Sequence, residues 1–230
     1  MRKKMKRRSM CGVLTTLTVL LAARGSASHQ ATELKPDNAP SCVSQQYPSV
    51  PLRSYQDKLN VLKVKYKLMA THGDVDAQLR LGILYEKSQG DLNNYAFARR
   101  WYLRAASQNE PAAQNNLGRL YYLGLGGPHD YNLARLWYEK AASQGLANAQ
   151  YNLGRFFSSH RSGSQDHTMA RLWYEKAAHQ GVAKAQYSLG HFFFYGLGGP
   201  RDYIQAHHWY KRAAQQGHLN AIMTLMFLNR

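Results

Sequence analysis

The chain has 230 residues and carries 30 Lys and Arg against 13 Asp and Glu, which gives a formal net charge of +17. Hydrophobic residues make up 44% of the sequence, a share that excludes a disordered polyelectrolyte despite the charge. Two cysteines are too few for a disulfide scaffold or for a four-cysteine zinc site. We therefore expect a folded protein whose basic charge needs an explanation.

The N-terminus has the order of a cleaved secretory signal. Six basic residues lie within residues 2–8, an apolar run extends from Cys11 to Ala23, and small residues follow at 25–28. The apolar run is too short to span a bilayer, and no later stretch is long enough. We predict that residues 1–27 are removed, which leaves 23 basic and 13 acidic residues and a net charge of +10. An uncleaved anchor or a chance basic arm is the alternative.

Residues 28–53 are expected to form a flexible linker, because Pro and Ser recur between Lys35 and Leu52. This segment holds Cys42, the one cysteine left in the predicted mature chain. An odd cysteine in an exported protein can pair with another chain, and an unpaired surface thiol is the alternative.

The rest of the chain has an internal period of 36 residues, without insertion or deletion over four units. Such a period is the signature of a repeat architecture. An Ala-Gln, a Leu-Gly, a Trp-Tyr and an Ala-Ala pair recur in register. These pairs begin at Ala77, Ala113, Ala149 and Ala185; at Leu81, Leu117, Leu153 and Leu189; at Trp101, Trp137, Trp173 and Trp209; and at Ala105, Ala141, Ala177 and Ala213.

Each unit is predicted to contain two antiparallel helices. The first has one apolar face, since Ala77, Leu81 and Tyr85 are spaced by four. Gly82 and its equivalents weaken this helix, so we expect them to allow close approach of a neighbour. A column of N-cap residues is expected to open the second helix, and Gln-Gly pairs to close it. The caps are Asn94, Asp130, Asp166 and Asp202, and the closing glycines are Gly145, Gly181 and Gly217.

The period continues beyond the four units on both sides. Residues 54–73 are predicted to be a preceding second helix, and residues 220–229 a final first helix in which Met226 takes the place of the usual glycine. The predicted domain 74–230 thus holds four repeats and a C-terminal half-repeat helix.

These repeated residues resemble the Sel-one-like repeat family, a relative of tetratricopeptide repeats. The resemblance implies an all-α fold, a right-handed α/α superhelical solenoid of helix-turn-helix repeats with an interior groove, which serves as an adaptor for other proteins. The third unit departs from the pattern, because Arg161-Ser162-Gly163-Ser164 replaces a Gly-rich turn. The chain also lacks the disulfide that some secreted members carry in each repeat.

No catalytic, metal or cofactor signature is present in the sequence, so no enzyme is expected. The adjacent His207 and His208 point to different faces of a helix, and no carboxylate or thiol joins His191 or His179 at a ligand spacing. The loop at Gly124–Gly127 could cradle a phosphate, but its repetition at Gly196–Gly199 favours a structural turn.

By the tetratricopeptide resemblance, variable columns of the first helices are expected to line a peptide-binding groove. Guanidinium and amide donors alternate with aromatic rings there, and such donors pair well with carboxylates. We therefore expect the partner to be another protein that offers an acidic segment or its C-terminus. The alternative is that these are only solvated or packing positions. The candidate residues are Arg80, Asn116, Arg119, Tyr122, Tyr151, Asn152, Arg155, Lys184, Tyr187, His191 and Phe194.

Two basic columns on the second helices are expected to form a solvated convex face. Arg135–Glu139 and Arg171–Glu175 have the i, i+4 spacing that neutralises charge locally. The export signal argues against a nucleic-acid partner, whereas anionic envelope polymers or lipid head groups could meet a basic surface. The columns are Arg99, Arg135, Arg171 and His207, and Arg104, Lys140, Lys176 and Arg212.

The sequence thus predicts a periplasmic or secreted, non-catalytic scaffold that binds another protein as an envelope adaptor, with no transmembrane segment after signal cleavage. A secreted factor that acts on host proteins is one alternative. An accessory cell-wall enzyme is another, which the missing catalytic residues disfavour.

Overall fold

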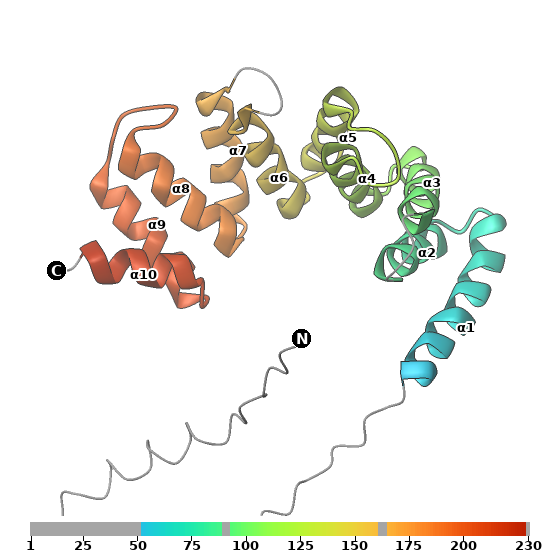
Figure 1. Cartoon of the computed structure of the whole chain (residues 1–230). Coiled ribbons are helices and arrows are strands. Elements are labelled where there is room, and N and C mark those ends of the chain that lie inside the picture. The colour runs from blue at the N-terminus through green and yellow to red at the C-terminus, as the bar shows by residue number, and fades with distance from the viewer. Residues whose placement is uncertain (1–51, 89–92, 161–164, 229–230) are drawn as a thin grey trace, which may run out of the picture. The chain divides into compact units, whose positions relative to one another are not determined.

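The computed structural model describes residues 52–88, 93–160 and 165–228, and within these ranges it contains helices and no strand (Figure 1). The predicted signal segment, most of the linker and Cys42 lie outside the described residues. No described helix combines the length and apolar character needed to cross a membrane. The ten described helices are α1 (Leu52–Thr71), α2 (Val75–Lys87), α3 (Asn93–Ser107), α4 (Pro111–Leu123), α5 (Tyr131–Ser143), α6 (Ala147–Phe157), α7 (His167–His179), α8 (Ala183–Tyr195), α9 (Tyr203–Gln215) and α10 (Leu219–Leu228).

The helices stack in chain order. Every extensive contact joins two consecutive helices, and α4 and α6 meet over a smaller area (Figure 1). Helices α2, α4, α6 and α8 are the first helices of the four units, and α3, α5, α7 and α9 are the second helices. The predicted α-solenoid of 36-residue helix pairs is confirmed. The extra helices α1 and α10 extend the same succession at either end.

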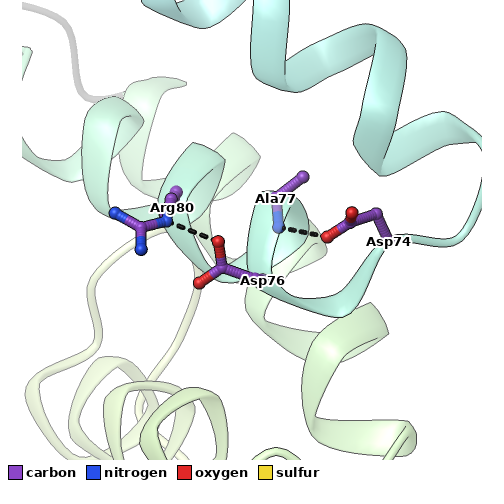
Figure 2. A network of polar contacts seen from close by, with 4 residues as sticks. All are labelled: Asp74, Asp76, Ala77 and Arg80. Atoms are coloured by element: carbon purple, nitrogen blue, oxygen red, sulfur yellow. Dashed lines mark hydrogen bonds and ion pairs between the residues drawn. The ribbon is translucent and has the colours of Figure 1, made fainter.

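Most of the predicted caps are present. The Asp130, Asp166 and Asp202 carboxylates each accept the backbone N–H three residues on, at 2.9 Å. The Asp74 carboxylate does the same for α2, at 2.8 Å from the Ala77 nitrogen (Figure 2). The prediction that Asn94 caps α3 is wrong, because α3 already begins at Asn93 and Asn94 lies inside the helix. The Asn94 side-chain amide instead donates to the Ser88 carbonyl at 3.0 Å.

Each helical glycine of the Leu-Gly column lies beneath a tyrosine ring of the second helix in its own unit. A Cβ atom at Gly82, for example, would lie 2.5 Å from a ring carbon of Tyr102. These tyrosines are 0–4% exposed. The predicted close approach is therefore confirmed, and it places the tyrosine column, beside the tryptophans, in the core. The pairs are Gly82–Tyr102, Gly118–Tyr138, Gly154–Tyr174 and Gly190–Tyr210.

Buried glutamines join successive units. The Gln114 amide nitrogen donates to the Ala106 carbonyl of the preceding second helix at 3.2 Å, and its oxygen accepts from Gln144 at 2.8 Å. The same two bonds recur at the other three positions, so the first bond links each unit to the preceding second helix and the second bond links the two helices of one unit. The column consists of Gln78, Gln114, Gln150 and Gln186, each at most 6% exposed.

The two Gly-rich turns pack onto backbone. A Cβ atom at Gly126 would lie 2.5 Å from the Tyr95 carbonyl group at the start of α3, and Gly198 approaches the His167 backbone at the start of α7 in the same way. These glycines pack against the backbone of the preceding unit. This contact supports a structural role for the turns over a phosphate-binding role.

The basic columns of the second helices are only partly solvated, contrary to expectation. Arg99 and Arg171 are half-buried, and their guanidinium groups lie 3.6 and 4.0 Å from the ring centres of Tyr121 and Phe193 in the next unit. The predicted Arg171–Glu175 pair is absent, because the Arg171 guanidinium turns toward Phe193 and the Pro200 carbonyl. The other column, from Arg104 to Arg212, is exposed and covers the tryptophan rings at 4.1–5.4 Å. Trp173 is the one tryptophan that is not fully buried.

Candidate functional site

The candidate groove residues all lie on the first helices α2, α4, α6 and α8, but they line separate hollows. A hollow of about 340 Å³ lies between α1 and α2 beside Arg80. A second, of about 470 Å³, lies around Tyr151 and Arg155, with Tyr122, Tyr174 and Ser188 also in its wall. A third, of about 280 Å³, contains Tyr187, His191 and Phe194. The candidates that line none of these three are Asn116, Arg119, Asn152 and Lys184.

Arg119 is engaged within the protein. Its guanidinium forms a salt bridge with one carboxylate oxygen of Glu86, and the Tyr102 hydroxyl donates to the other at 2.9 Å. Burial and the neighbouring carboxylate raise the pKa of Tyr102 well above its usual range, so its hydroxyl stays a donor. The sequence predicted that Arg119 would face a ligand carboxylate. In the structure its guanidinium is instead paired with Glu86. Glu86 was missed, although it is the only acid in its column.

Arg155 occupies the same position one unit later and has a different neighbour. Tyr122 stands 36 residues after Glu86 and donates its hydroxyl to Ser159 at 3.0 Å. The Arg155 guanidinium lies 5.9 Å from the Tyr151 ring centre, and none of the ion pairs among the described residues includes it. Arg155 therefore presents a positive charge to the 470 Å³ hollow without an internal carboxylate.

Hydroxyl groups surround this arginine. The Ser158 and Tyr174 hydroxyls lie 3.0 Å apart, and burial raises the pKa of Tyr174 to about 12. Burial likewise raises the pKa of Tyr138, against the opposing effect of the Arg119 and Arg155 charges. These phenols are thus neutral donors at neutral pH, and the site offers donors to an incoming acceptor.

The remaining candidates are distributed around these hollows. Arg80 pairs with Asp76 at 2.5 Å on the exposed side of α2 (Figure 2). The Asn152 amide donates to the Asn115 side chain at 2.8 Å, which links α6 to α4. His191 packs on Tyr195, with 4.5 Å between ring centres, and burial lowers its pKa. Lys184 is exposed, and its charge helps to lower the pKa of His218.

The described residues contain no group of three or more His, Cys, Asp or Glu side chains arranged to hold a metal ion. The site therefore consists of one uncompensated guanidinium, several phenol and alcohol donors, and aromatic walls. Such a set can bind an anionic or polar group and orient it between rings.

Comparison with known protein families identifies the repeat. The model of the Sel1 repeat matches residues 75–110, 111–146, 147–182 and 183–218, which together make up more than half of the chain. The chain belongs to the Sel1 repeat family. Sel1 repeats usually serve as scaffolds for protein–protein interaction, and this chain is a Sel1-repeat scaffold.

Two solved structures resemble it over most of its length. One is a protective antigen of uropathogenic Escherichia coli with an SLR fold, 37% identical with a TM-score of 0.67 over 72% of this chain. The other is a Sel1 repeat protein from Oxalobacter formigenes, 32% identical with a TM-score of 0.65 over 71% of this chain. The match covers only 36% and 65% of those two proteins. No curated protein sequence matches the chain.

Proposed function

We propose that this Sel1-repeat protein is an exported, non-catalytic adaptor that holds an acidic segment or the C-terminus of another protein on its first-helix face. The observation that carries the proposal is the Arg155 guanidinium, which faces a hollow of about 470 Å³ without an acidic partner among the described residues. A cation beside aromatic rings and hydroxyl donors suits a partner that brings both negative charge and side-chain surface.

Export belongs to the same proposal. Its support is the basic, then apolar, then small-residue order at the N-terminus. A periplasmic or extracellular protein meets few nucleic acids, so the residual basic charge would act on acidic proteins instead.

Capture of partners by the purified chain tests the binding proposal. We compare the unaltered chain with Arg155→Glu, and with Lys211→Glu as the matched control, because Lys211 is an exposed cation on α9 far along the chain from this hollow. Proteins retained from a native envelope extract are identified by mass spectrometry. Partners should be lost with Arg155→Glu and kept with Lys211→Glu. Identical sets for all three chains would contradict the proposal.

A secreted factor that acts on host proteins is the second candidate. It is favoured by the 37% identity to a protein described as a protective antigen. Cell fractionation separates the two: an adaptor remains in the envelope fraction, whereas a secreted factor accumulates in the medium. Full-length chain retained in the cytoplasm would contradict both.

A further inference from the structure

The repeat contains its own example of a bound carboxylate. In the first unit the Glu86 carboxylate is held by the Tyr102 hydroxyl from α3 and by the Arg119 guanidinium from α4. The two binding groups lie 16 and 33 residues after the glutamate. Applying these offsets one unit later, from position 122, leads to Tyr138 and Arg155. Both binding groups are therefore repeated, but the residue that would supply the carboxylate is Tyr122.

The second copy of this arrangement is unfilled within the described residues. Tyr138 is 3% exposed, and no described side chain or backbone group forms a hydrogen bond with its hydroxyl. Arg155 has no ion-pair partner there. The Tyr122 side chain turns to Ser159 instead. A phenol donor and a cation thus lie together without the carboxylate that binds their counterparts one unit earlier.

The space beside these groups fits the missing oxygen. Tyr122, Tyr138, Asn152, Arg155 and Phe156 border a recess of about 10 Å³, room for about one water-sized group. Tyr122 and Arg155 also line the 470 Å³ hollow, so a ligand in the hollow can reach the recess with one oxygen. A planar carboxylate can place one oxygen there and keep the other on the guanidinium, as Glu86 does, whereas a tetrahedral phosphate needs more room.

The other units lack one or more of these parts. In the third unit Ser158 occupies the Glu86 position and its hydroxyl lies 3.0 Å from that of Tyr174, while His191 replaces the arginine. In the fourth unit Phe194 occupies the position. Among the described units, only the Tyr138–Arg155 pair combines a free phenol donor with an uncompensated arginine.

We infer that the Tyr138–Arg155 recess is a carboxylate-binding site, in which a partner's carboxylate takes the place that Glu86 fills in the first unit. This inference rests on the proposed protein binding and names the group recognised. An Asp or Glu side chain and a C-terminus both supply that carboxylate. The phenol and the guanidinium bind its two oxygens, and the rings of Tyr122 and Tyr151 flank the attached chain.

The internal example supplies the decisive variant. Tyr122→Glu places a carboxylate at the position equivalent to Glu86, so the chain should fill its own site. Tyr122→Phe is the matched control, because it keeps the ring and removes only the hydroxyl that bonds Ser159. Circular dichroism and the thermal midpoint show whether each variant folds, and Tyr122→Glu should raise the midpoint because it compensates Arg155.

The probes are three short peptides that differ in their carboxylates. Acetyl-Tyr-Glu-amide offers a side-chain carboxylate, acetyl-Tyr-Gln with a free C-terminus offers a terminal one, and acetyl-Tyr-Gln-amide offers none. Binding is followed by the NMR signals of the Arg155 Nε–H and the Tyr138 ring in the full chain. We expect a carboxylate peptide to shift both NMR signals and the uncharged peptide to leave both unchanged. The carboxylate peptide that binds more tightly shows whether the site prefers a side-chain carboxylate or a C-terminus.

Tyr122→Glu should weaken binding of that peptide at least tenfold, and Lys211→Gln, which lowers the net charge by the same amount at an exposed position of α9, should leave it within about twofold. Equal shifts with the uncharged peptide, or unchanged binding to Tyr122→Glu, would overturn the carboxylate site. If envelope partners remain bound to Tyr122→Glu, the site is wrong and the adaptor function stands. If the unaltered chain captures no partner but binds the carboxylate peptides, the adaptor function fails and the site stands.

Discussion

Two sets of columns in the repeat differ in how much they vary from unit to unit. We call the Gln, Gly and Tyr columns between helices the seams, and the column of α2, α4, α6 and α8 that begins with Glu86, with its neighbours, the first-helix face. Along the seams, the Gln, Gly and Tyr columns keep one residue type in every unit and form the same contact four times. On the first-helix face, the column that begins with Glu86 continues as Tyr122, Ser158 and Phe194, and each side chain has different partners. Columns that stay constant therefore carry the fold, and columns that change give each unit its own chemistry.

The largest expected effect comes from filling a seam. At Gly154 a Cβ atom would lie 2.7 Å from a ring carbon of Tyr174, so Gly154→Val forces the helices apart. We expect a loss of about 3 kcal/mol in the free energy of unfolding, measured by urea denaturation. Gly154→Ala combined with Tyr174→Leu provides the control, since removal of the ring should make the alanine less costly. Strictly additive effects in that pair would contradict the proposed contact.

The glutamine seam should be the next most sensitive. Gln114→Ala removes the buried side chain that donates to the Ala106 carbonyl and accepts from Gln144, so that carbonyl keeps only the Asn109 backbone N–H and Gln144 loses an acceptor. The expected cost is about 2 kcal/mol by the same measurement. Gln144→Ala deletes the exposed end of the same contact and should cost less. A larger loss at Gln144 than at Gln114 would show that burial does not decide the effect.

A change on the first-helix face should be milder. Glu86→Gln removes the charge that compensates Arg119, and both side chains of this pair are partly exposed, so we expect a loss of about 1 kcal/mol. Glu139→Gln breaks the more exposed Arg135–Glu139 pair and should cost about 0.5 kcal/mol or less. If Glu86→Gln destabilises the chain as much as Gly154→Val, the distinction between seam and face is wrong.

Acidification should give the smallest effect. Burial lowers the pKa of His191, and burial together with Lys184 lowers that of His218. A histidine with a lowered pKa in the folded state contributes its full stability above about pH 6.5 and loses it as the pH falls through the folded pKa. Calorimetry should therefore show a slightly lower thermal midpoint at about pH 5 than at pH 7. A His191→Gln, His218→Gln double variant should flatten this dependence, and an unchanged slope would assign it to other groups.

The fold could be predicted from the sequence because its signals are local. The apolar spacing of Ala77, Leu81 and Tyr85 and the Asp caps each depend on residues within one or two turns of a helix, and the 36-residue period repeats these local signals in every unit. The error at Asn94 arose because the first unit enters its second helix earlier than the others do. Column alignment gives the register of a residue but not the exact start of a helix.

The chemistry of the site was harder to predict because its pairs cross between units. Arg119 was expected to be free, yet it is compensated by Glu86, 33 residues earlier and on another helix. Arg171 was expected to pair with Glu175 along its own helix, yet it packs on an aromatic ring of the next unit. Spacing within one helix shows neither contact. Arg155 lies beside the Tyr151 ring, but the reason it lacks a carboxylate is visible only when the stacked units are compared.

The succession of contacts from each helix to the next also bears on motion. Because few contacts reach past the adjacent helix, α1 and α10 can detach and return without opening the middle of the array. Amide hydrogen exchange should then be fastest in these two helices and slowest in the central units. The hollow beside Arg155 is built from α4, α6, α7 and α8, so it lies in the part of the chain that opens least often. A ligand there would meet walls that are already in place when it arrives.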